Sequence, residues 1–289
     1  MAEWWDGFWS TYNAVVYGIG VNAMLALSIY LTLSCGLLSL ANAAFMGIGA
    51  YAAAMISMNT ELAFPVALAA GTVLPALVAI IIGIPVLRLS GVYLAMATLG
   101  FGEVVRVIVL NMEITGGPMG LNGIPQKTEF WHIALLLAAT MFLLARLRRS
   151  KIGRAFEAIK EDEIAARLMG VNVAGYKLLA FTLGAAIAGL AGGLNAHYTF
   201  TIGPGNYAFE NAVDILTMAV FGGTSNLIGP TLGATILTLL PEVLRQFRDF
   251  RLAANGLILV LVILYLPKGI WDPRRIRGYF RRQKIGGAA

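Results

Sequence analysis

The chain has few charged residues for its length. Of its 289 residues, 12% are Asp, Glu, Lys or Arg and 58% are hydrophobic. A soluble domain has about twice that share of charge, so the composition excludes an ordinary soluble protein and favours a bilayer-embedded helical bundle. The net charge of +6 does not indicate nucleic-acid binding, because the basic residues cluster beside apolar segments rather than forming a stripe interleaved with aromatics.

Reactive side chains are equally scarce. There are one cysteine and two histidines, which leaves no disulfide framework and no metal-binding spacing. Cys35 lies in an apolar segment and is predicted to be a buried thiol. No G-x-x-x-x-G-K-[ST] sequence is present, so the chain has no phosphate-binding loop for a nucleotide. These absences predict a protein that is not an enzyme and binds neither a metal nor a cofactor itself.

The N-terminal residues do not have the basic start of a cleavable signal. Glu3 and Asp6 lie among aromatic residues that predict an interfacial belt ahead of the first span, namely Trp4, Trp5, Phe8 and Trp9.

Apolar segments of membrane-spanning length, about 20 residues, recur along the whole chain. The sequence therefore predicts an all-α polytopic transmembrane bundle of eight or nine spans forming one domain over residues 1–289. Two segments are short and are separated by Gly222–Asn226, which predicts half-helices or a re-entrant pair. Pro65, Pro75 and Pro85 are expected to bend the third span or mark its ends. The candidate spans are 14–34, 38–58, 65–87, 91–111, 131–147, 176–199, 211–222, 227–241 and 252–267.

The positions of the basic residues predict the orientation. With the N-terminus outside, 16 of the 21 Lys and Arg fall on the inner side, including a basic tail at 268–289. This is the asymmetry of the positive-inside rule, and it places the C-terminus inside. Arg245, Arg248 and Arg251 break the rule. They either pair internally with Glu242 and Asp249 or bind an acidic partner outside.

Small residues dominate the span at 176–199. Two rows with a spacing of four residues, Ala185-Gly189-Gly193 and Gly184-Ala188-Gly192, predict close helix packing. His197 continues the first row, either as a hydrogen-bonded histidine at the membrane edge or near a substrate path. Glycine and alanine-rich stretches at 36–50 and 226–234 suggest an internal repeat, as in many transporters.

Intramembrane ionisable residues are costly unless they are paired or face water. Glu103 and Arg106 are three residues apart and are predicted to pair on one helix. Glu210, Asp214 and Thr217 share a helical face and either line a translocation path or form a packed network. Asn22 and Asn42 are weaker candidates for the same path.

The segment 146–170 is the most charged part of the chain. Its periodicity predicts an amphipathic helix with Ile159, Ile164 and Leu168 on one face. Glu161 or Asp162 is a candidate N-cap, and Gly170 stands where the helix would end. Such a helix between membrane spans needs a partner surface.

Several motifs together resemble one family. They are the runs 90–106, 115–120 and 153–166, then Phe221-Gly222-Gly223 with Gly229-Pro230, and Leu266-Pro267-Lys268-Gly269. This order resembles the LivM-like permease subunits of branched-chain amino acid ABC importers and covers almost the whole chain.

The resemblance implies that the loop at about 148–175 docks on a separate ATPase. Ala165-Ala166-x-x-x-Gly170 matches the family's coupling motif, although Ile164 stands at its acidic position with Glu163 beside it. The ATPase-coupling residues implied are Glu157, Ala158, Glu161, Asp162, Glu163, Ala165, Ala166 and Gly170.

The resemblance also implies the location and the partners. We expect a bacterial or archaeal cytoplasmic membrane protein that pairs with a homologous second permease and contacts lipid but no nucleic acid. Two ATPase subunits would use ATP and Mg, and an extracytoplasmic binding protein would deliver solute, docking at Arg245, Arg248 and Arg251. A permease for urea or short amides is the alternative within the family. An ion-coupled secondary transporter using Glu103, Glu210 or Asp214 is the alternative outside it.

Overall fold

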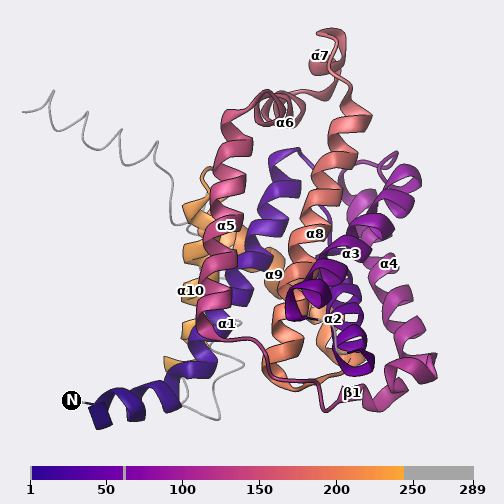
Figure 1. The fold of residues 1–289 in the computed structure, drawn as a ribbon. Coiled ribbons are helices and arrows are strands. Elements are labelled where there is room, and N and C mark those ends of the chain that lie inside the picture. Colours follow the sequence, from indigo (N-terminus) through magenta and orange to yellow (C-terminus); the bar gives the residue numbers. More distant parts are fainter. Residues whose placement is uncertain (1, 61–62, 244–289) are drawn as a thin grey trace, which may run out of the picture.

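The computed structural model describes residues 2–60 and 63–243, and this part of the chain is a bundle of ten α-helices with one short pair of strands (Figure 1). The predicted all-α membrane bundle is confirmed. The helices are α1 (Ala2–Ser34), α2 (Asn42–Asn59), α3 (Phe64–Val86), α4 (Gly91–Asn111), α5 (Phe130–Arg149), α6 (Lys151–Glu161), α7 (Glu163–Leu168), α8 (Val173–Thr199), α9 (Phe209–Gly222) and α10 (Ile228–Val243). The strands β1 (Leu121–Asn122) and β2 (Thr201–Ile202) pair antiparallel, and three 3-10 turns are η1 (Glu113–Thr115), η2 (Gly117–Met119) and η3 (Pro204–Tyr207).

Within the described residues, five helical segments are long and apolar enough to cross a membrane. They are Asn13–Ser34, Phe64–Val86, Gly91–Asn111, Phe130–Arg149 and Val173–Thr199. Helices α2, α9 and α10 are shorter, with 18, 14 and 16 residues. The predicted span 252–267 and the basic tail lie outside the described residues.

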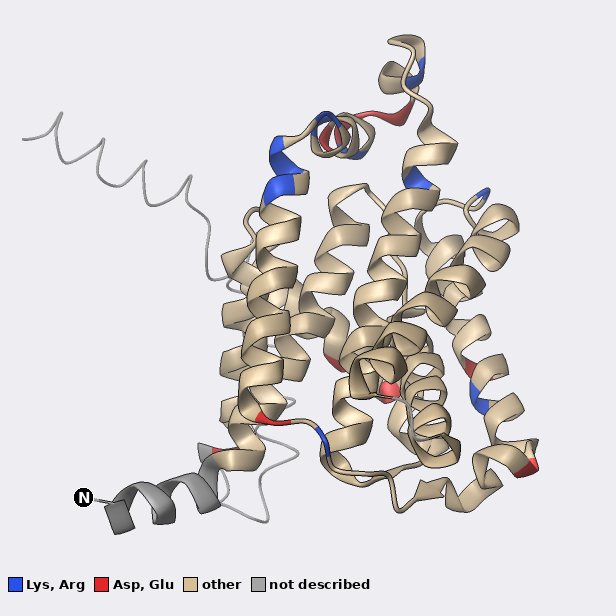
Figure 2. Ribbon diagram, viewed as in Figure 1, with Lys and Arg blue, Asp and Glu red and all other residues tan. Residues whose placement is uncertain are grey.

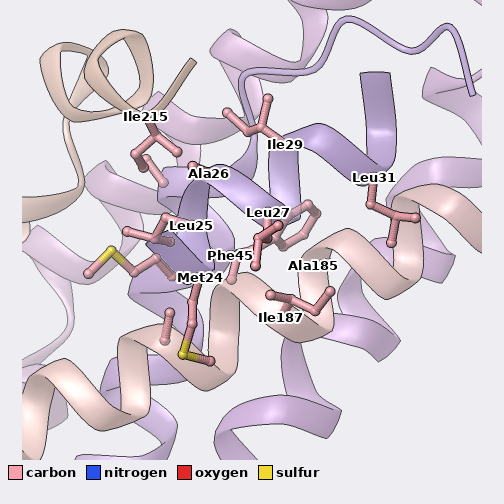
Figure 3. Packing of buried hydrophobic residues seen from close by; sticks show 14 of the residues in the cluster. Met24, Leu25, Ala26, Leu27, Ile29, Leu31, Phe45, Ala185, Ile187 and Ile215 are labelled. Carbon is pink, nitrogen blue, oxygen red and sulfur yellow. The ribbon is translucent and has the colours of Figure 1, made fainter. Parts of the chain in front are cut away.

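Helices α1 and α8 form the centre of the bundle. Side chains of α1, among them Met24, Leu25 and Leu27, pack against Phe45 of α2 and Ile187 of α8 (Figure 3). The small-residue rows of α8 meet α2 and α3, which are its most extensive contacts.

Close packing of α8 depends on glycine, as its two rows of small residues predict. A Cβ added at Gly192 would collide with the Met46 carbonyl oxygen, and one at Gly189 would collide with the Gly71 carbonyl oxygen. In a bilayer the hydrophobic effect does not drive helices together, and close packing of their backbones stabilises the bundle instead.

Helix α2 begins in the interior of the protein, whereas Phe209 and Glu210 at the start of α9 are exposed. After α1 the chain runs without helix through 37–41, where Leu37, Ser39 and Ala41 are buried, and only then starts α2. The predicted continuous span 38–58 is therefore wrong at its start. After α8, β2 pairs with β1 at the end of the molecule opposite α7 (Figure 1), η3 turns inward, and α9 follows.

Helices α9 and α10 form a hairpin, which confirms two short helices joined at the glycine break. A Cβ at Gly222 would collide with the Gly229 carbonyl oxygen, so the turn requires glycine there. Of the two stretches suggested as an internal repeat, 36–50 contains the break and the first half of α2, and 226–234 contains the end of the turn and the first residues of α10; the repeat itself stays a prediction.

Candidate coupling and translocation sites

Basic side chains gather at one end of the molecule. Figure 2 shows Lys and Arg concentrated on α6, α7 and the adjoining ends of α5 and α8. The segment predicted to dock on a partner forms this end.

The docking segment is two helices rather than one. Ser150 caps α6, because its Oγ accepts hydrogen bonds from the backbone N–H groups of Ile152 and Gly153. Asp162 caps α7, and its Oδ1 accepts from Ile164 N at 2.9 Å and Ala165 N at 3.0 Å. Of the two predicted caps, Asp162 is confirmed.

Gly170 ends this segment, as predicted. Its φ is +81°, a left-handed conformation that favours glycine. No atom lies within 4 Å of the position a Cβ would occupy, so the requirement for glycine comes from the backbone conformation alone.

An ion pair fastens α7 to α8. Lys177 Nζ lies 2.6 Å from Glu163 Oε2, and Arg167 adds a contact of 3.2 Å to the other carboxylate oxygen. The Lys177 side chain is 9% exposed, and a buried ammonium needs such a partner. Glu163 therefore holds α7 in place, whereas Glu157 and Glu161 remain exposed.

The predicted apolar face of the segment is wrong. Ile159 is buried in α6 at 4% exposure, but Ile164 and Leu168 in α7 are 74% and 83% exposed. The chain changes direction at Asp162, whose φ of −155° and ψ of 110° are extended, and so the helical period does not continue from α6 into α7.

Ile164, Leu168 and Met169 together form an exposed apolar tip, with Met169 at 85% exposure. Sequence reasoning missed this tip as a contact surface. The available signal was the distance from the Asp162 cap to the Gly170 terminator, which delimits a short separate helix. Ala165 lies exposed beside the tip, and Ala166 is buried against the rest of the chain.

The remaining coupling candidates lie around the base of α6. Glu157 and Glu161 line a cleft of about 580 Å³ between α1, α5, α6 and the α9–α10 turn. Ala158 lines a shallower groove beside Gly170. Across the cleft, Arg148 donates to Asn226 Oδ1 at 2.6 Å and to the Ser225 carbonyl oxygen at 2.9 Å.

The path candidates separate into two groups. Asn22, Asp214 and Thr217 line one groove between α1, α9 and α10, where Asn22 donates to Thr238 Oγ1 at 2.9 Å. Glu210 is exposed one turn before Asp214. Asn42 is instead 2% exposed and donates to Ser28 Oγ at 2.7 Å, inside the packed core.

Glu103 and Arg106 pair at 2.8 Å, as predicted. Glu103 also lines a small cavity between the first turns of α2 and α9, which we call the helix-start cavity.

His197 is fully buried. Its Nε2 lies 2.7 Å from Ser57 Oγ and its Nδ1 lies 2.8 Å from the Gly193 carbonyl oxygen, which confirms a hydrogen-bonded histidine. Cys35, just beyond the α1 span, is also fully buried, and burial raises the pKa of its thiol to about 12.

Within residues 2–60 and 63–243, no group of three or more His, Cys, Asp or Glu side chains has the arrangement of a metal site. Arg245, Arg248 and Arg251 lie outside the described residues, so their predicted role stays a prediction.

A helical membrane bundle in which one helix, α2, starts in the interior after an irregular segment is an arrangement found in solute permeases. Comparison with known proteins gives the family. Residues 12–266 match the family described as "Branched-chain amino acid transport system / permease component", and the chain belongs to that family. It is a transport permease component, not an enzyme.

The relatives have related names. The chain is 35% identical over 291 residues to the high-affinity branched-chain amino acid transport system permease proteins LivM of Salmonella typhimurium and Escherichia coli, covering 89% of this chain and 67% of each relative. It is 32% identical to LivH of Escherichia coli over 148 residues, 50% of this chain and 46% of the relative. The autoinducer 2 import system permease protein LsrC of Klebsiella pneumoniae is 31% identical over 174 residues, 56% of this chain and 50% of the relative. No solved structure matches the chain.

Proposed function

We propose that this chain forms half of the translocation pore of an ATP-driven ABC importer for branched-chain or other small neutral amino acids. Names of the LivM and LivH relatives support amino acids as the substrate class. Family membership alone does not select the substrate, because LsrC is named for autoinducer 2.

The observation that best supports an ATP-driven transporter is the apolar tip. Ile164, Leu168 and Met169 are exposed at the charged end of the molecule, where an apolar surface is stabilised only by a partner. The Asp162 cap and the Glu163–Lys177 ion pair hold the tip in one orientation. A groove on an ATPase subunit is the partner that fits a rigid helix with an apolar end.

Charge supports the orientation. Of the 11 Lys and Arg in the described residues, nine are either Arg88 or belong to the segment 146–177 around α6 and α7, and the other two are Arg106 and Lys127. By the positive-inside rule this end is cytoplasmic, which agrees with an N-terminus outside and a C-terminus inside a bacterial or archaeal cytoplasmic membrane.

The partners follow from this assignment. A homologous second permease would cover the exposed acidic face of α9, where Glu210 and Asp214 otherwise face lipid at high cost. Two ATPase subunits would bind and hydrolyse ATP with Mg, and an extracytoplasmic binding protein would deliver the solute. Asn22, Asp214 and Thr217 would then line part of the path.

An ion-coupled carrier is less well supported. Of its candidate coupling residues, Glu103 is paired with Arg106 on the same helix. Such a carrier also has no use for a capped docking helix with an apolar tip.

Reconstitution tests the proposal. Liposomes containing the complete importer should take up radiolabelled L-leucine only with internal ATP and external binding protein. Liposomes with this chain alone should take up none. Leucine uptake by the single chain under an ion gradient would contradict the proposal, and ATP-driven uptake of urea instead of leucine would contradict the substrate class.

A further inference from the structure

The docking segment and the α9–α10 hairpin belong to different parts of the bundle. Helix α5, which leads into α6 at the charged end (Figure 1), packs chiefly on α1 and α6, whereas α9 and α10 pack chiefly on each other and on α1. The cleft of about 580 Å³ lies between them, with α6 on one side and the hairpin turn 223–226 on another. The most direct route from α6 to the hairpin at this end of the molecule therefore crosses the cleft.

Arg148, in the last turn of α5, bridges the cleft. Its Nη1 donates to Asn226 Oδ1 at 2.6 Å, and its Nη2 donates to the Ser225 carbonyl oxygen at 2.9 Å. A planar guanidinium holds two acceptors in a fixed geometry, which a single N–H donor does not. The bridge therefore sets both the distance and the orientation of the turn relative to α5.

The α5 end of the bridge is attached closely to the docking segment. Ser150, two residues after Arg148, ends α5 and caps α6. Its Oγ also donates to the Leu147 carbonyl oxygen at 2.6 Å. A Cβ added at Gly153 would collide with the Arg148 carbonyl oxygen. Because the corner is this tight, a displacement of α6 also displaces the end of α5 that carries Arg148.

The other end of the bridge is attached to a compact hairpin. A Cβ added at Gly233 of α10 would collide with the Met218 carbonyl oxygen of α9, so the two helices are in backbone contact. Packed backbones of this kind move together rather than deform. Asp214 and Thr217 lie on α9, so a displacement of the turn changes the position of these two candidates for the translocation path.

We propose that the bridge from Arg148 to Asn226 and Ser225 transmits movement of the docking segment to the α9–α10 hairpin. An ATPase that pulls on α6 and α7 displaces the α5 corner, and the bridge carries this displacement to the hairpin turn. Arg148 is then a positioning residue, which acts on the path through α9. The inference rests on the proposed function and adds to it the contact by which ATP-driven movement reaches one wall of the path.

The adjacent Arg149 offers a matched control. It is also exposed at the end of α5, and its side chain makes no hydrogen bond or ion pair within residues 2–60 and 63–243. R148M and R149M each remove one positive charge from the same end of the molecule and keep an unbranched side chain. Only R148M removes the bridge.

The complete importer, assembled with each variant in liposomes, is assayed for leucine imported per ATP hydrolysed. Co-purification of the ATPase subunits measures assembly. We expect R148M to lower the ratio roughly fivefold, the upper range for an exposed contact, and R149M to change it less than about twofold. Equal ratios in the two variants would overturn the inference. It would also be overturned if R148M lowered only the amount of assembled complex, because a residue needed merely for folding leaves the ratio unchanged.

The acceptor side gives a second test that leaves all the arginines in place. N226A removes the side-chain acceptor, whereas S225A, one residue earlier, keeps the backbone carbonyl to which Arg148 donates. We expect N226A to lower the ratio about threefold and S225A to leave it near the wild-type value. The same ratio in both variants would show that the acceptor is not needed and would overturn the inference.

Combining the two sides tests whether they act through one contact. If the bridge transmits the movement, N226A has no further effect once Arg148 is replaced, and R148M/N226A should show the same roughly fivefold loss as R148M. Independent effects would multiply to about fifteenfold. That result would overturn the inference, because the two residues would then act separately.

The wild-type importer separates this inference from the proposed function. If it imports no leucine with ATP, the proposed function is wrong and this inference fails with it. If it imports leucine with ATP but R148M couples as well as R149M, only the role of the bridge is overturned.

Discussion

The helices at the charged end begin with a capping side chain, whereas α2, which starts in the interior, and α9 do not. Helices α6, α7 and α8 begin at Ser150, Asp162 and Asn172, whose side-chain oxygens accept backbone hydrogen bonds. Helices α2 and α9 begin at alanine without any such bond.

This distribution of caps is the reverse of what the free-energy cost of unsatisfied backbone N–H groups would favour. A cap contributes about 1 kcal/mol and is least needed where water satisfies the same N–H groups. In the interior an open N–H costs more, yet no side chain caps the first turn of α2, although the N–H of its N-cap residue Ala41 donates to Ser39 Oγ at 3.2 Å. The capped starts hold a rigid docking surface at the charged end.

The largest expected effect is at the docking end. Leu168→Glu places a charge in the apolar tip, and we expect ATP-dependent uptake and ATPase binding to fall roughly thirtyfold or more, as for a central interface residue. Leu168→Met keeps the apolar surface and should retain most activity. Unchanged binding of the ATPase to the Glu variant, measured by co-purification, would remove the tip from the interface.

The terminator of the docking segment should have the next largest effect. Gly170→Val requires a β-branched residue at a φ of +81° and costs about 1–2 kcal/mol. We expect several-fold weaker coupling, measured as leucine imported per ATP hydrolysed, with normal membrane insertion. Gly170→Asn tolerates this conformation better and serves as the control. Normal coupling in the Val variant would show that the left-handed turn is not needed to orient α7.

Removing a cap from the docking end sharpens the comparison with α9. Asp162→Ala should destabilise α7 by about 1 kcal/mol and lower coupling a few-fold, whereas Asp162→Asn keeps an acceptor oxygen and should have little effect. Hydrogen exchange at Ile164 and Ala165 would report the loss directly. Unchanged exchange at both amides would mean that the cap does not stabilise α7.

The smallest expected effect is on Cys35. Because the thiol is fully buried and its pKa is raised to about 12, it stays protonated at neutral pH, and maleimide should not label the native protein. Met169→Cys in the apolar tip should be labelled rapidly in the same chain. Labelling of native Cys35 would show that the end of α1 opens to water.

Patterns within one helix were predictable from the sequence. The rows of small residues along α8, the Glu103–Arg106 pair and the Gly170 terminator each depend on spacing inside a single element, and the structure confirms all three. The burial of Cys35 follows from its apolar surroundings in the same way.

The remaining features depend on where the chain changes direction. Hydrophobic periodicity does not detect the break at Asp162, and so Ile164 and Leu168 were assigned to the wrong face. The segment 37–41 is apolar enough to read as helix, which hid the interior start of α2. The meeting of α2 with α9 involves residues far apart in the chain, and no local pattern reports it.

The helix-start cavity also affects how the protein is made. Ribosomes deliver α2 to the membrane long before α9. In the same way, β1 is made well before β2, the strand with which it pairs. Until η3 and α9 are in place, the side of α2 that packs against them has no partner within the chain. Chains truncated between α5 and α9 are therefore expected to insert without assembling and to be removed by membrane proteases.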